Sequence, residues 1–228
     1  MRVFVAGLHE GELAIGGDEH HYLGRVRRVR VGDLIELVDG AGHRASAKIV
    51  RMTEDETIVE VAPVETVDEP RPHVRVLLPL IKGDRMDYAL EKLVEVGVNE
   101  LIVWQGERSV VRLDASKRPQ RLAHYAGVVE AASRQSGRTT LPSVRFAELR
   151  HALRDLPAGA RYVLDAAAAR GRATGDDLTI ASGPEGGFSP VELSQLETAR
   201  FVGLGLGPQT LRAETAPVIA VALIRADG

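Results

Sequence analysis

The sequence predicts an α/β fold in which a small β-rich barrel precedes a larger, mostly parallel sheet covered by helices. Three observations predict it. Residues 1–66 contain short segments that alternate apolar and polar side chains, as half-buried strands do. From Val74 onward, apolar strand-like runs alternate with helix-like segments, which favours parallel strands joined by helical crossovers. Charged residues and two prolines interrupt this pattern at 66–72, so we expect domains over residues 1–70 and 71–228.

The elements of the first domain follow from local patterns. Leu34–Val38 is expected to be a strand, and Asp39–Gly42 a turn whose glycines tolerate positive φ. Residues 44–52 and 57–64 alternate again and are expected to be further strands of the barrel.

The second domain begins with a nearly continuous apolar run at Val74–Leu80, which is typical of a buried parallel strand. Asp84 is expected to cap a helix whose apolar stripe ends at Gly97. Ser189–Glu192 has the pattern of a capping box with proline at the first helical position. The remaining elements are expected as strands at 101–104, 162–164, 178–181 and 201–204, and as helices at 117–136 and 216–225.

Composition restricts the class of protein. Of the 228 residues, 44% are hydrophobic and 4% aromatic, so the core must be aliphatic. The absence of cysteine excludes disulfides and a catalytic thiol, and it fits a reducing compartment. The N-terminus lacks a signal-peptide pattern, and no apolar run is long enough to span a membrane. We therefore expect a soluble cytoplasmic protein.

A cluster of arginines lies in an acidic surround. Residues 1–70 contain 8 Lys and Arg against 14 Asp and Glu, whereas residues 71–228 contain 21 against 18. A docking patch for an anion is predicted by four cations within six positions, Arg25, Arg27, Arg28 and Arg30. The alternation of Arg and Val fits the solvated face of a strand equally well. The pair His20-His21 lacks further ligands at suitable spacing, so no metal site is expected.

Two glycine-rich segments each lie between a predicted strand and a predicted helix. Ligands bind beyond the carboxyl ends of strands in open α/β sheets, so Gly183–Gly187 is a candidate binding turn. It has neither the GxGxxG spacing nor the GxxxxGK[ST] spacing, which argues against dinucleotides and triphosphates. A tight turn without a ligand is the alternative. In the second segment, 204–217, Glu214 fits a role at the helix start, whereas Arg212 suits an anion facing the loop.

Together these segments, IASGPEGGFSPVEL and LGLGPQTLRAETA, resemble the C-terminal signature of the RsmE family of bacterial 16S ribosomal RNA (uracil-N3)-methyltransferases. Other blocks that are similar in order and spacing make the resemblance cover nearly the whole chain: 20–40, 81–97, 108–111 and 132–138. The chain departs from common family residues at Leu122, Gln209 and Ala213.

The resemblance implies an N-terminal PUA-like β-barrel that binds RNA and a C-terminal SPOUT domain with a trefoil knot that holds S-adenosylmethionine. The residues that it implies for the methyl donor are Gly183, Glu185, Gly186, Gly187, Leu204, Gly205, Leu206, Leu211 and Ala213. It further implies a homodimer, to which the closing helix would contribute Val218, Ile219, Val221, Ala222 and Leu223.

Methylation of uracil N3 requires loss of its proton and stabilisation of charge on O2 and O4. Arg212 is the first candidate for that stabilisation, because guanidinium is a permanent cation with a planar donor fork. Glu185 or Glu214 is the candidate proton acceptor, and Glu214 has the alternative role of orienting Arg212. The target base must be unpaired or flipped out. The expected RNA-binding residues are Arg25, Arg27, Arg28, Arg30, Lys92, Arg134, Gln135 and Arg138, with Arg134 and Arg138 as further candidates for charge stabilisation.

The expected partner is 16S ribosomal RNA, in an assembled small subunit. Three alternatives stay open at this point. The chain fits another knotted methyltransferase that acts on ribose 2′-O or guanine N1, and it fits a non-catalytic RNA-binding factor of ribosome assembly. A nucleotide-binding α/β enzyme is the third, and the absence of a phosphate-loop lysine weakens it.

Overall fold

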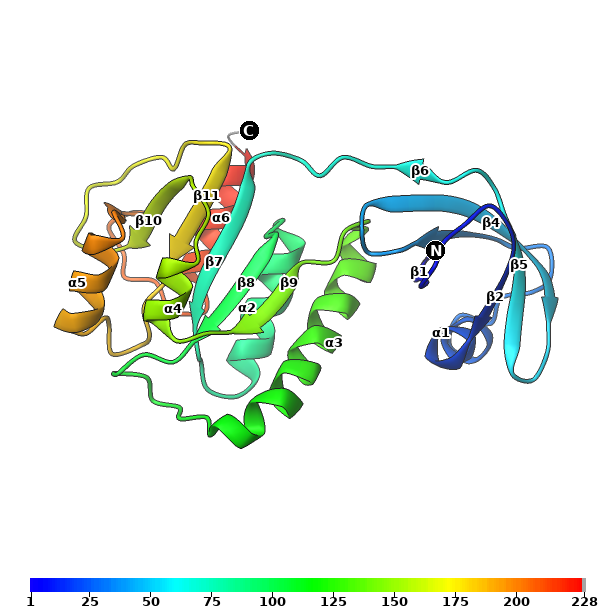
Figure 1. Ribbon diagram of the computed structural model, residues 1–228, viewed down its shortest axis with the longest axis horizontal. Helices are drawn as coiled ribbons and strands as arrows, with labels where there is room; N and C mark the ends of the chain where they lie inside the picture. The colour runs from blue at the N-terminus through cyan, green and yellow to red at the C-terminus, as the bar shows by residue number, and fades with distance from the viewer. Residues whose placement is uncertain (227–228) are drawn as a thin grey trace. The chain divides into compact units, whose positions relative to one another are not determined.

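The computed structural model describes residues 1–226, and Figure 1 shows the elements in chain order. The chain divides into two compact units. Unit 1 comprises Met1–Glu69 and Ser133–Leu141, and unit 2 comprises Pro70–Ala132 and the chain from Pro142 onward. The sequence pattern did not indicate the second segment of unit 1. Backbone hydrogen bonds attach it there, from Leu141 N to Gly40 O (2.9 Å) and from Gly42 N to Thr139 O (3.3 Å).

Unit 1 is built on a sheet with the strand order β1-β3-β4-β5-β2, and β6 pairs with β4. The parallel pairing of β1 with β3 is the exception in an otherwise antiparallel sheet. The strands expected at 34–38, 44–52 and 57–64 are confirmed, while three other strands escaped prediction. The bounds are β1 (Arg2–Phe4), β2 (Gly11–Gly16), β3 (Leu34–Val38), β4 (His43–Met52), β5 (Glu56–Val61) and β6 (Glu65–Thr66).

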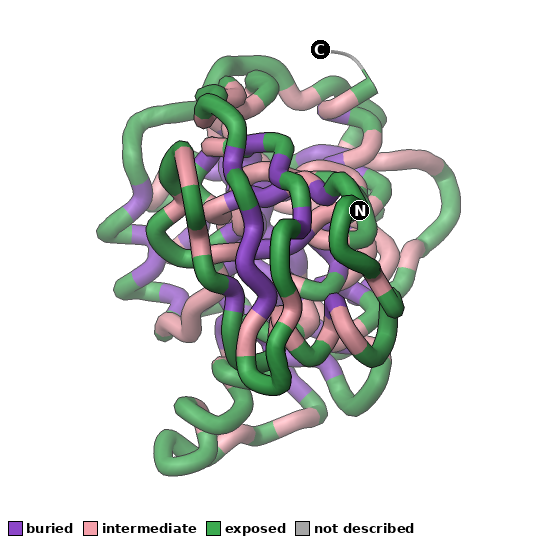
Figure 2. The backbone as a smooth tube through the Cα atoms, turned by 90° about the vertical axis from the view of Figure 1, so that its right-hand side faces the viewer, coloured by how far each residue is buried: buried purple, intermediate pink, exposed green. Residues whose placement is uncertain are grey.

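The core of unit 1 follows from the two-residue period of its strands. Ala45, Ala47 and Ile49 of β4 are buried, while the residues between them are exposed. They pack with Leu37 and Val59 from the neighbouring strands. Figure 2 shows buried backbone in purple beside exposed turns in green.

The arginine-rich segment is not a strand, so that alternative interpretation was wrong. Helix α1 (Gly17–His21) continues directly into a π-helical turn, η1 (Tyr22–Val26). Leu23 is buried and Val29 packs against the core of unit 1, but Val26 and Val31 are 62% and 61% exposed, so the valines do not all face one side as they would in a strand. The segment therefore presents its arginines from a helical turn and the loop that follows.

Unit 2 contains a six-stranded sheet with the order β12-β10-β11-β7-β8-β9, and every pair in it is parallel. This confirms the predicted parallel sheet, although β9 was not expected. The order places the ends of β11, β10 and β12 side by side. The bounds are β7 (His73–Pro79), β8 (Glu100–Trp104), β9 (Ser143–Phe146), β10 (Ala160–Leu164), β11 (Asp177–Ala181) and β12 (Val202–Leu204).

Helices cover both faces of this sheet (Figure 1). Successive residues of β7 point to opposite faces, so Val76 and Leu78 pack with α2, α3 and α6, whereas Leu77 packs with α4 and α5. On the second face, Trp104 of β8 lies beside Leu77 and is 1% exposed. The bounds are α2 (Asp84–Glu95), α3 (Arg118–Ser136) after the short turn η2 (Ala115–Lys117), α4 (Leu149–Arg154), α5 (Pro190–Thr198) and α6 (Ala216–Ala226).

The predicted N-cap is correct for α5 and wrong for α2. The capping box of α5 is confirmed, because Ser189 Oγ accepts from Glu192 N (3.2 Å) and Ser189 N donates to Glu192 Oε2 (2.7 Å). Asp84 does not cap α2: the N-cap is Gly83, with φ 63°, and Asp84 is already in the first turn. The negative charge of Asp84 in the first turn therefore interacts favourably with the positive end of the helix dipole, but its side chain forms no capping hydrogen bond.

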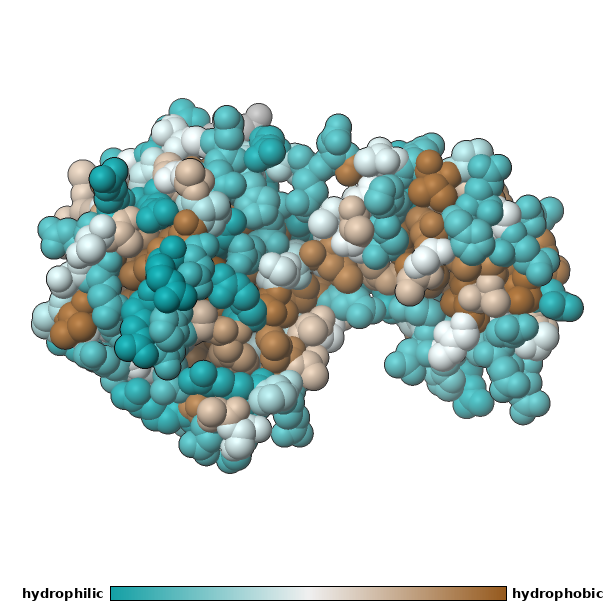
Figure 3. Space-filling model, viewed as in Figure 1, coloured by the Kyte–Doolittle hydropathy of each residue, from teal (hydrophilic) through white to brown (hydrophobic). Residues whose placement is uncertain are grey.

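The visible surface is mixed in hydropathy. Figure 3 shows apolar side chains in brown between more numerous hydrophilic ones in teal. No helix within residues 1–226 is both long and apolar enough to span a bilayer. Within the same residues, no group of three or more His, Asp or Glu side chains is placed to hold a metal ion.

Candidate functional site

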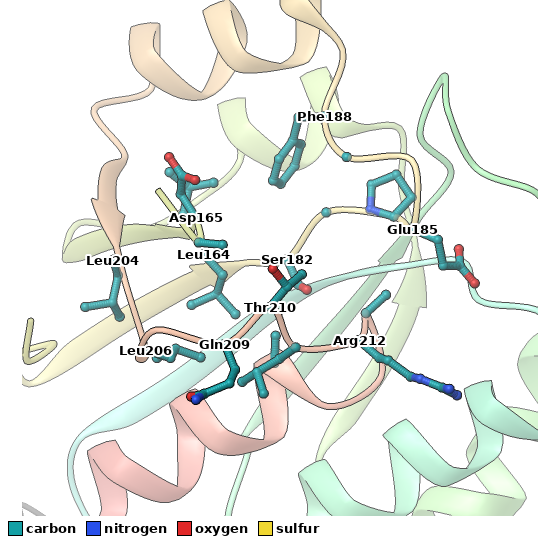
Figure 4. A pocket seen from close by; sticks show the side chains of 18 of the residues that line it. Leu164, Asp165, Ser182, Glu185, Phe188, Leu204, Leu206, Gln209, Thr210 and Arg212 are labelled. Carbon is teal, nitrogen blue, oxygen red and sulfur yellow. The ribbon is translucent and has the colours of Figure 1, made fainter. Parts of the chain in front are cut away.

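A cavity of about 650 Å³ opens at the carboxyl ends of β10, β11 and β12. Its size is in the range of sites for small molecules. Figure 4 shows that the labelled side chains come from the ends of these strands and from the three loops that follow them. The lining comprises Arg85, Val163, Leu164, Asp165, Ala166, Ser182, Gly183, Pro184, Glu185, Gly187, Phe188, Leu193, Leu204, Leu206, Gly207, Gln209, Thr210, Leu211, Arg212, Ala213 and Ala216.

The inner wall of the cavity is apolar. Leu164, Leu204 and Leu206 gather on one side of it (Figure 4). Phe188 lines another side and stacks on buried Trp104, with ring centroids 5.6 Å apart and planes 6° from parallel. Because Trp104 belongs to the core of the sheet, the Phe188 ring is supported from behind. This wall suits a flat or aliphatic group of a ligand.

Most of the donor-binding residues implied by the resemblance line the cavity: Gly183, Glu185, Gly187, Leu204, Leu206, Leu211 and Ala213. Gly186 and Gly205 are not among the lining residues. A Cβ at Gly186 would lie 2.9 Å from Arg108 O, and a Cβ at Gly205 would lie 2.2 Å from Ala168 O. Both positions therefore need glycine because another backbone segment passes close by.

Asp165 is a cavity residue that sequence reasoning missed. It follows β10, its amide donates to Leu204 O (3.2 Å), and its Oδ1 accepts from Ala167 N (2.8 Å). A single aspartate before an alanine-rich stretch carries no motif. Its position directly after a predicted strand was the available signal, since the turns after the two neighbouring strands were both singled out. Phe188, Gln209 and Thr210 also line the cavity; they lie within the two glycine-rich segments but were not assigned to the site.

Four charged side chains form a row at one margin of the cavity, and we call them the charged rim: Arg85, Glu185, Arg212 and Glu214. Arg85 Nη2 donates to Glu185 Oε1 at 3.0 Å, and Arg85 Nη1 lies 3.7 Å from Glu214 Oε2. Arg212 Nη1 lies 3.8 Å from Glu214 Oε1. The Glu214 side chain is 7% exposed, whereas that of Arg212 is 77% exposed. In Figure 4, Glu185 and Arg212 both extend on the side away from Leu204.

The last loop also offers backbone groups. Within residues 1–226, the backbone amides of Leu206, Leu211 and Ala213 donate to no backbone or side-chain acceptor. All three residues line the cavity. Unpaired amides beside an apolar wall can bind the polar edge of a planar heterocycle, and a carboxylate such as Asp165 can accept from hydroxyl groups. This combination fits an adenine, a ribose and an aliphatic chain.

In unit 1, the structure brings the predicted RNA-docking arginines to the surface. Arg25, Arg27, Arg28 and Arg30 are all exposed. Arg28 has φ 53°, an unusual conformation for a residue other than glycine, and it lies just after the π-helical turn. Arg27 Nε lies 3.2 Å from Met1 Sδ.

Three of the other four predicted RNA contacts have partners within the protein. Arg134 pairs with Glu19 and lies over the Tyr22 ring at 4.8 Å. Arg138 Nη2 donates to Glu69 Oε1 at 3.1 Å. Lys92 lies between two carboxylates, and its hydrogen bonds to Glu91 and Glu95 raise its pKa. Gln135 is exposed. None of these four residues lines the cavity, where Arg85 and Arg212 are the cations.

Comparisons with known proteins agree with this arrangement. Residues 68–225 match the family model described as RNA methyltransferase domain, and residues 15–62 match the model of the RNA methyltransferase PUA domain. The ribosomal RNA small subunit methyltransferase E of Mycobacterium bovis is 30% identical over 225 residues, with 92% of this chain and 84% of that protein covered. Its counterpart in Bacillus subtilis is 29% identical, with 92% and 88% covered.

Two solved structures are similar over almost their full length. The ribosomal RNA small subunit methyltransferase E of Neisseria gonorrhoeae, bound to S-adenosylmethionine, has a TM-score of 0.86 and 31% identity, covering 97% of this chain and 95% of that one. A Legionella pneumophila protein in complex with S-adenosylmethionine has a TM-score of 0.89 and 26% identity, covering 100% and 97%.

The fold and the matched models define an RNA methyltransferase that carries a PUA domain and uses S-adenosylmethionine. More specifically, the chain belongs to the ribosomal RNA small subunit methyltransferase E family. The resemblance drawn from the two glycine-rich segments is thereby confirmed.

Proposed function

We propose that this chain transfers the methyl group of S-adenosylmethionine to N3 of a uridine in 16S ribosomal RNA. The observation that carries the proposal is the cavity after β10, β11 and β12. In this cavity, an apolar wall, unpaired backbone amides and a charged rim lie together. The relatives in Mycobacterium bovis and Bacillus subtilis are named as methyltransferases of small-subunit ribosomal RNA, which supports this substrate class.

The cavity residues divide the binding of S-adenosylmethionine between them. Leu204, Leu206 and Phe188 would cover apolar parts, the amides of Leu211 and Ala213 would bind the adenine edge, and Asp165 would accept from the ribose. The bound donor supplies a methyl group on a sulfonium, which is activated for transfer. Holding the donor and the base in line supplies a large part of the rate enhancement.

The charged rim supplies the remaining chemistry. The N3 proton of uracil passes to Glu185, which lines the cavity, directly or through a water molecule. Arg212 then donates hydrogen bonds to O2 or O4, where negative charge develops. Glu214 is buried behind Arg212 and orients it, which favours the second of the two roles considered for this glutamate.

Analysis of modified nucleosides tests the reaction. Purified chain, methyl-labelled donor and small subunits that lack the modification should yield 3-methyluridine on mass spectrometry of the digested RNA. Comparison of free 16S RNA with assembled subunits tests our proposal that the assembled subunit is the substrate. A label on ribose 2′-O or guanine N1 would establish one of the alternative reactions. Donor binding without any RNA product would indicate a non-catalytic assembly factor.

The exposed arginines of unit 1 are proposed to dock the RNA backbone. Replacement of Arg27 and Arg28 with alanine should weaken RNA binding and lower the slope of log K against log salt by about 2, since each phosphate contact contributes about one unit. A salt titration of binding measures both effects. Arg44→Ala is the matched control, because Arg44 is exposed in the same unit and pairs with Glu65. An unchanged slope in the double variant would refute the docking role.

A homodimer is proposed from the outer face of α6. Ile219 and Leu223 lie one turn apart and are 39% and 42% exposed. Val221, which was expected in the same contact, is 0% exposed and belongs to the core of unit 2, so that assignment was wrong.

Charges on this face should separate the two copies. Replacement of Ile219 and Leu223 with aspartate should leave a monomer of 24.6 kDa in light scattering, whereas the unaltered chain should have twice that mass. Val191→Asp, on an exposed site of α5, is the control and should remain dimeric. If the unaltered chain is monomeric at micromolar concentration, the dimer proposal fails.

We propose two further properties. The trefoil knot implied by the family is proposed for the segment from Leu204 to the start of α6, and a cytoplasmic location is proposed from the ribosomal substrate.

A further inference from the structure

Arg85 occupies a position that helix energetics do not favour. It is the second residue of α2, where the helix dipole is positive and where acidic residues are preferred. The helix itself is held by Met86, Leu90 and Leu93, which are buried in the main core of unit 2. The backbone of Arg85 is therefore fixed in place, and its side chain reaches carboxylates outside the helix.

The partners of Arg85 lie on two different loops of the cavity. Glu185 belongs to the glycine-rich turn after β11, and its Oε1 accepts from Arg85 Nη2 at 3.0 Å. Glu214 belongs to the last loop before α6, and its Oε2 lies 3.7 Å from Arg85 Nη1. Within residues 1–226, Glu214 Oε2 is buried and has no hydrogen-bond partner. Arg85 is thus the nearest cation to that oxygen in the charged rim.

A link between the glycine-rich turn after β11 and the last loop before α6 would hold both segments in place for a ligand. Gly187 has φ 72°, and a Cβ there would meet nothing within 4 Å, so the turn that carries Glu185 has open space beside Gly187, although Gly186 packs against Arg108. In the last loop, the amides of Leu206, Leu211 and Ala213 are unpaired within the described residues. Weakly held segments lose conformational entropy when they close on a ligand, and a preformed link lowers that cost.

We infer that Arg85 is a positioning residue for the methyl donor, because its guanidinium group ties the glycine-rich turn to the last loop across the mouth of the cavity. The inference rests on the proposed use of this cavity for S-adenosylmethionine. Arg85 lines the cavity, but its role is carried out through Glu185 and Glu214, which it holds in register. Its loss should therefore weaken donor binding more than RNA binding.

Trp104 provides a direct measurement of donor binding. It is the single tryptophan of the chain, and it stacks on Phe188, which lines the cavity. Titration of the full-length chain with S-adenosylmethionine, followed by tryptophan fluorescence and by calorimetry, should show an increase of roughly tenfold in the Kd of Arg85→Ala. The KM for the donor should rise to a similar extent, while the KM for RNA should stay within about twofold.

Two further variants serve as a partial restoration and as a control. Arg85→Lys keeps the charge but not the fork, so it should recover part of the donor affinity by restoring one of the two contacts. Arg154→Ala removes an exposed arginine that pairs with Asp155 at 2.9 Å outside the cavity, and it should bind the donor normally. Thermal unfolding of each variant should stay close to that of the unaltered chain, since the Arg85 side chain is 40% exposed.

A double-mutant cycle with Glu185→Gln decides whether Arg85 acts through this carboxylate. The double variant should bind the donor no more weakly than the single variant with the lower donor affinity. The reason is that both single variants and the double variant lose the same link between Arg85 and Glu185. Normal donor Kd and KM in Arg85→Ala, or strictly additive effects in the cycle, would overturn the inference. Failure of the proposed function looks different: the unaltered chain would bind the donor, with Arg85 effects intact, but would methylate no RNA.

Discussion

Replacement of Arg212 with alanine is expected to lower kcat for methyl transfer about 100- to 1,000-fold, the range seen when one donor to a developing anion is removed. The side chain is 77% exposed and lies 3.8 Å from Glu214, so its removal leaves no buried gap in the fold. Donor affinity should therefore change little. The measurement is single-turnover transfer of labelled methyl to small subunits, with both substrates saturating.

Two companions make the Arg212 result specific. Arg212→Lys keeps a cation but loses the planar fork, so its rate should fall between those of the unaltered chain and the alanine variant. Arg150→Ala is the control: this arginine is 67% exposed and pairs with Glu148 at 3.0 Å. If Arg212→Ala transfers methyl groups at the normal rate, the charge on the base must be stabilised by another group of the charged rim.

Gly205→Ala should have the second large effect, a loss of donor binding caused by displaced backbone. The added Cβ would lie 2.2 Å from Ala168 O and 2.9 Å from Ala169 O, and neither carbonyl can rotate away as a side chain would. The segment after β10 must then shift against the last loop, and both contribute to the cavity wall. We expect the free energy of unfolding to fall by about 1–3 kcal/mol and donor affinity to fall at least about tenfold.

The matched control is the same substitution at Gly127. This glycine lies inside α3, and a Cβ there would meet nothing within 4 Å. Gly127→Ala should stabilise the chain by about 0.5–1 kcal/mol, because alanine is the better helix former, and it should bind the donor normally. Urea unfolding and calorimetry with S-adenosylmethionine measure both variants. Normal donor binding by Gly205→Ala would mean that the close approach at this position does not shape the cavity.

The glycines show how far the pattern of residues reached. The resemblance assigned Gly183, Gly186, Gly187 and Gly205 alike to the methyl donor. The structure separates them, since Gly183 and Gly187 line the cavity, while Gly186 and Gly205 face the backbone of Arg108 and Ala168. A sequence shows where glycine is required, but it does not show why. Close approach of a ligand and close approach of another chain segment both require glycine.

The roles of the arginines also could not all be predicted from the sequence. Arg27 and Arg212 are exposed, as a docking role and a catalytic role require. Arg134 and Arg138 come from an equally suggestive block, yet they pair with Glu19 and Glu69 of unit 1. Those partners are 115 and 69 positions away in sequence. Arg85 was not singled out as a site residue, because its partners, Glu185 and Glu214, are also far from it along the chain.

The sequence by itself determined the parallel α/β sheet, most of its elements, the family, and the two glycine-rich segments that bound the cavity. These depend on local periodicity, on turn residues and on motifs that are continuous in the chain. The tertiary structure decided which residues of those segments face the cavity, and it added Asp165, Phe188 and Arg85. The physical reason is that the strand order β12-β10-β11 brings three separate loops together, and the charged rim exists only where those loops meet the start of α2.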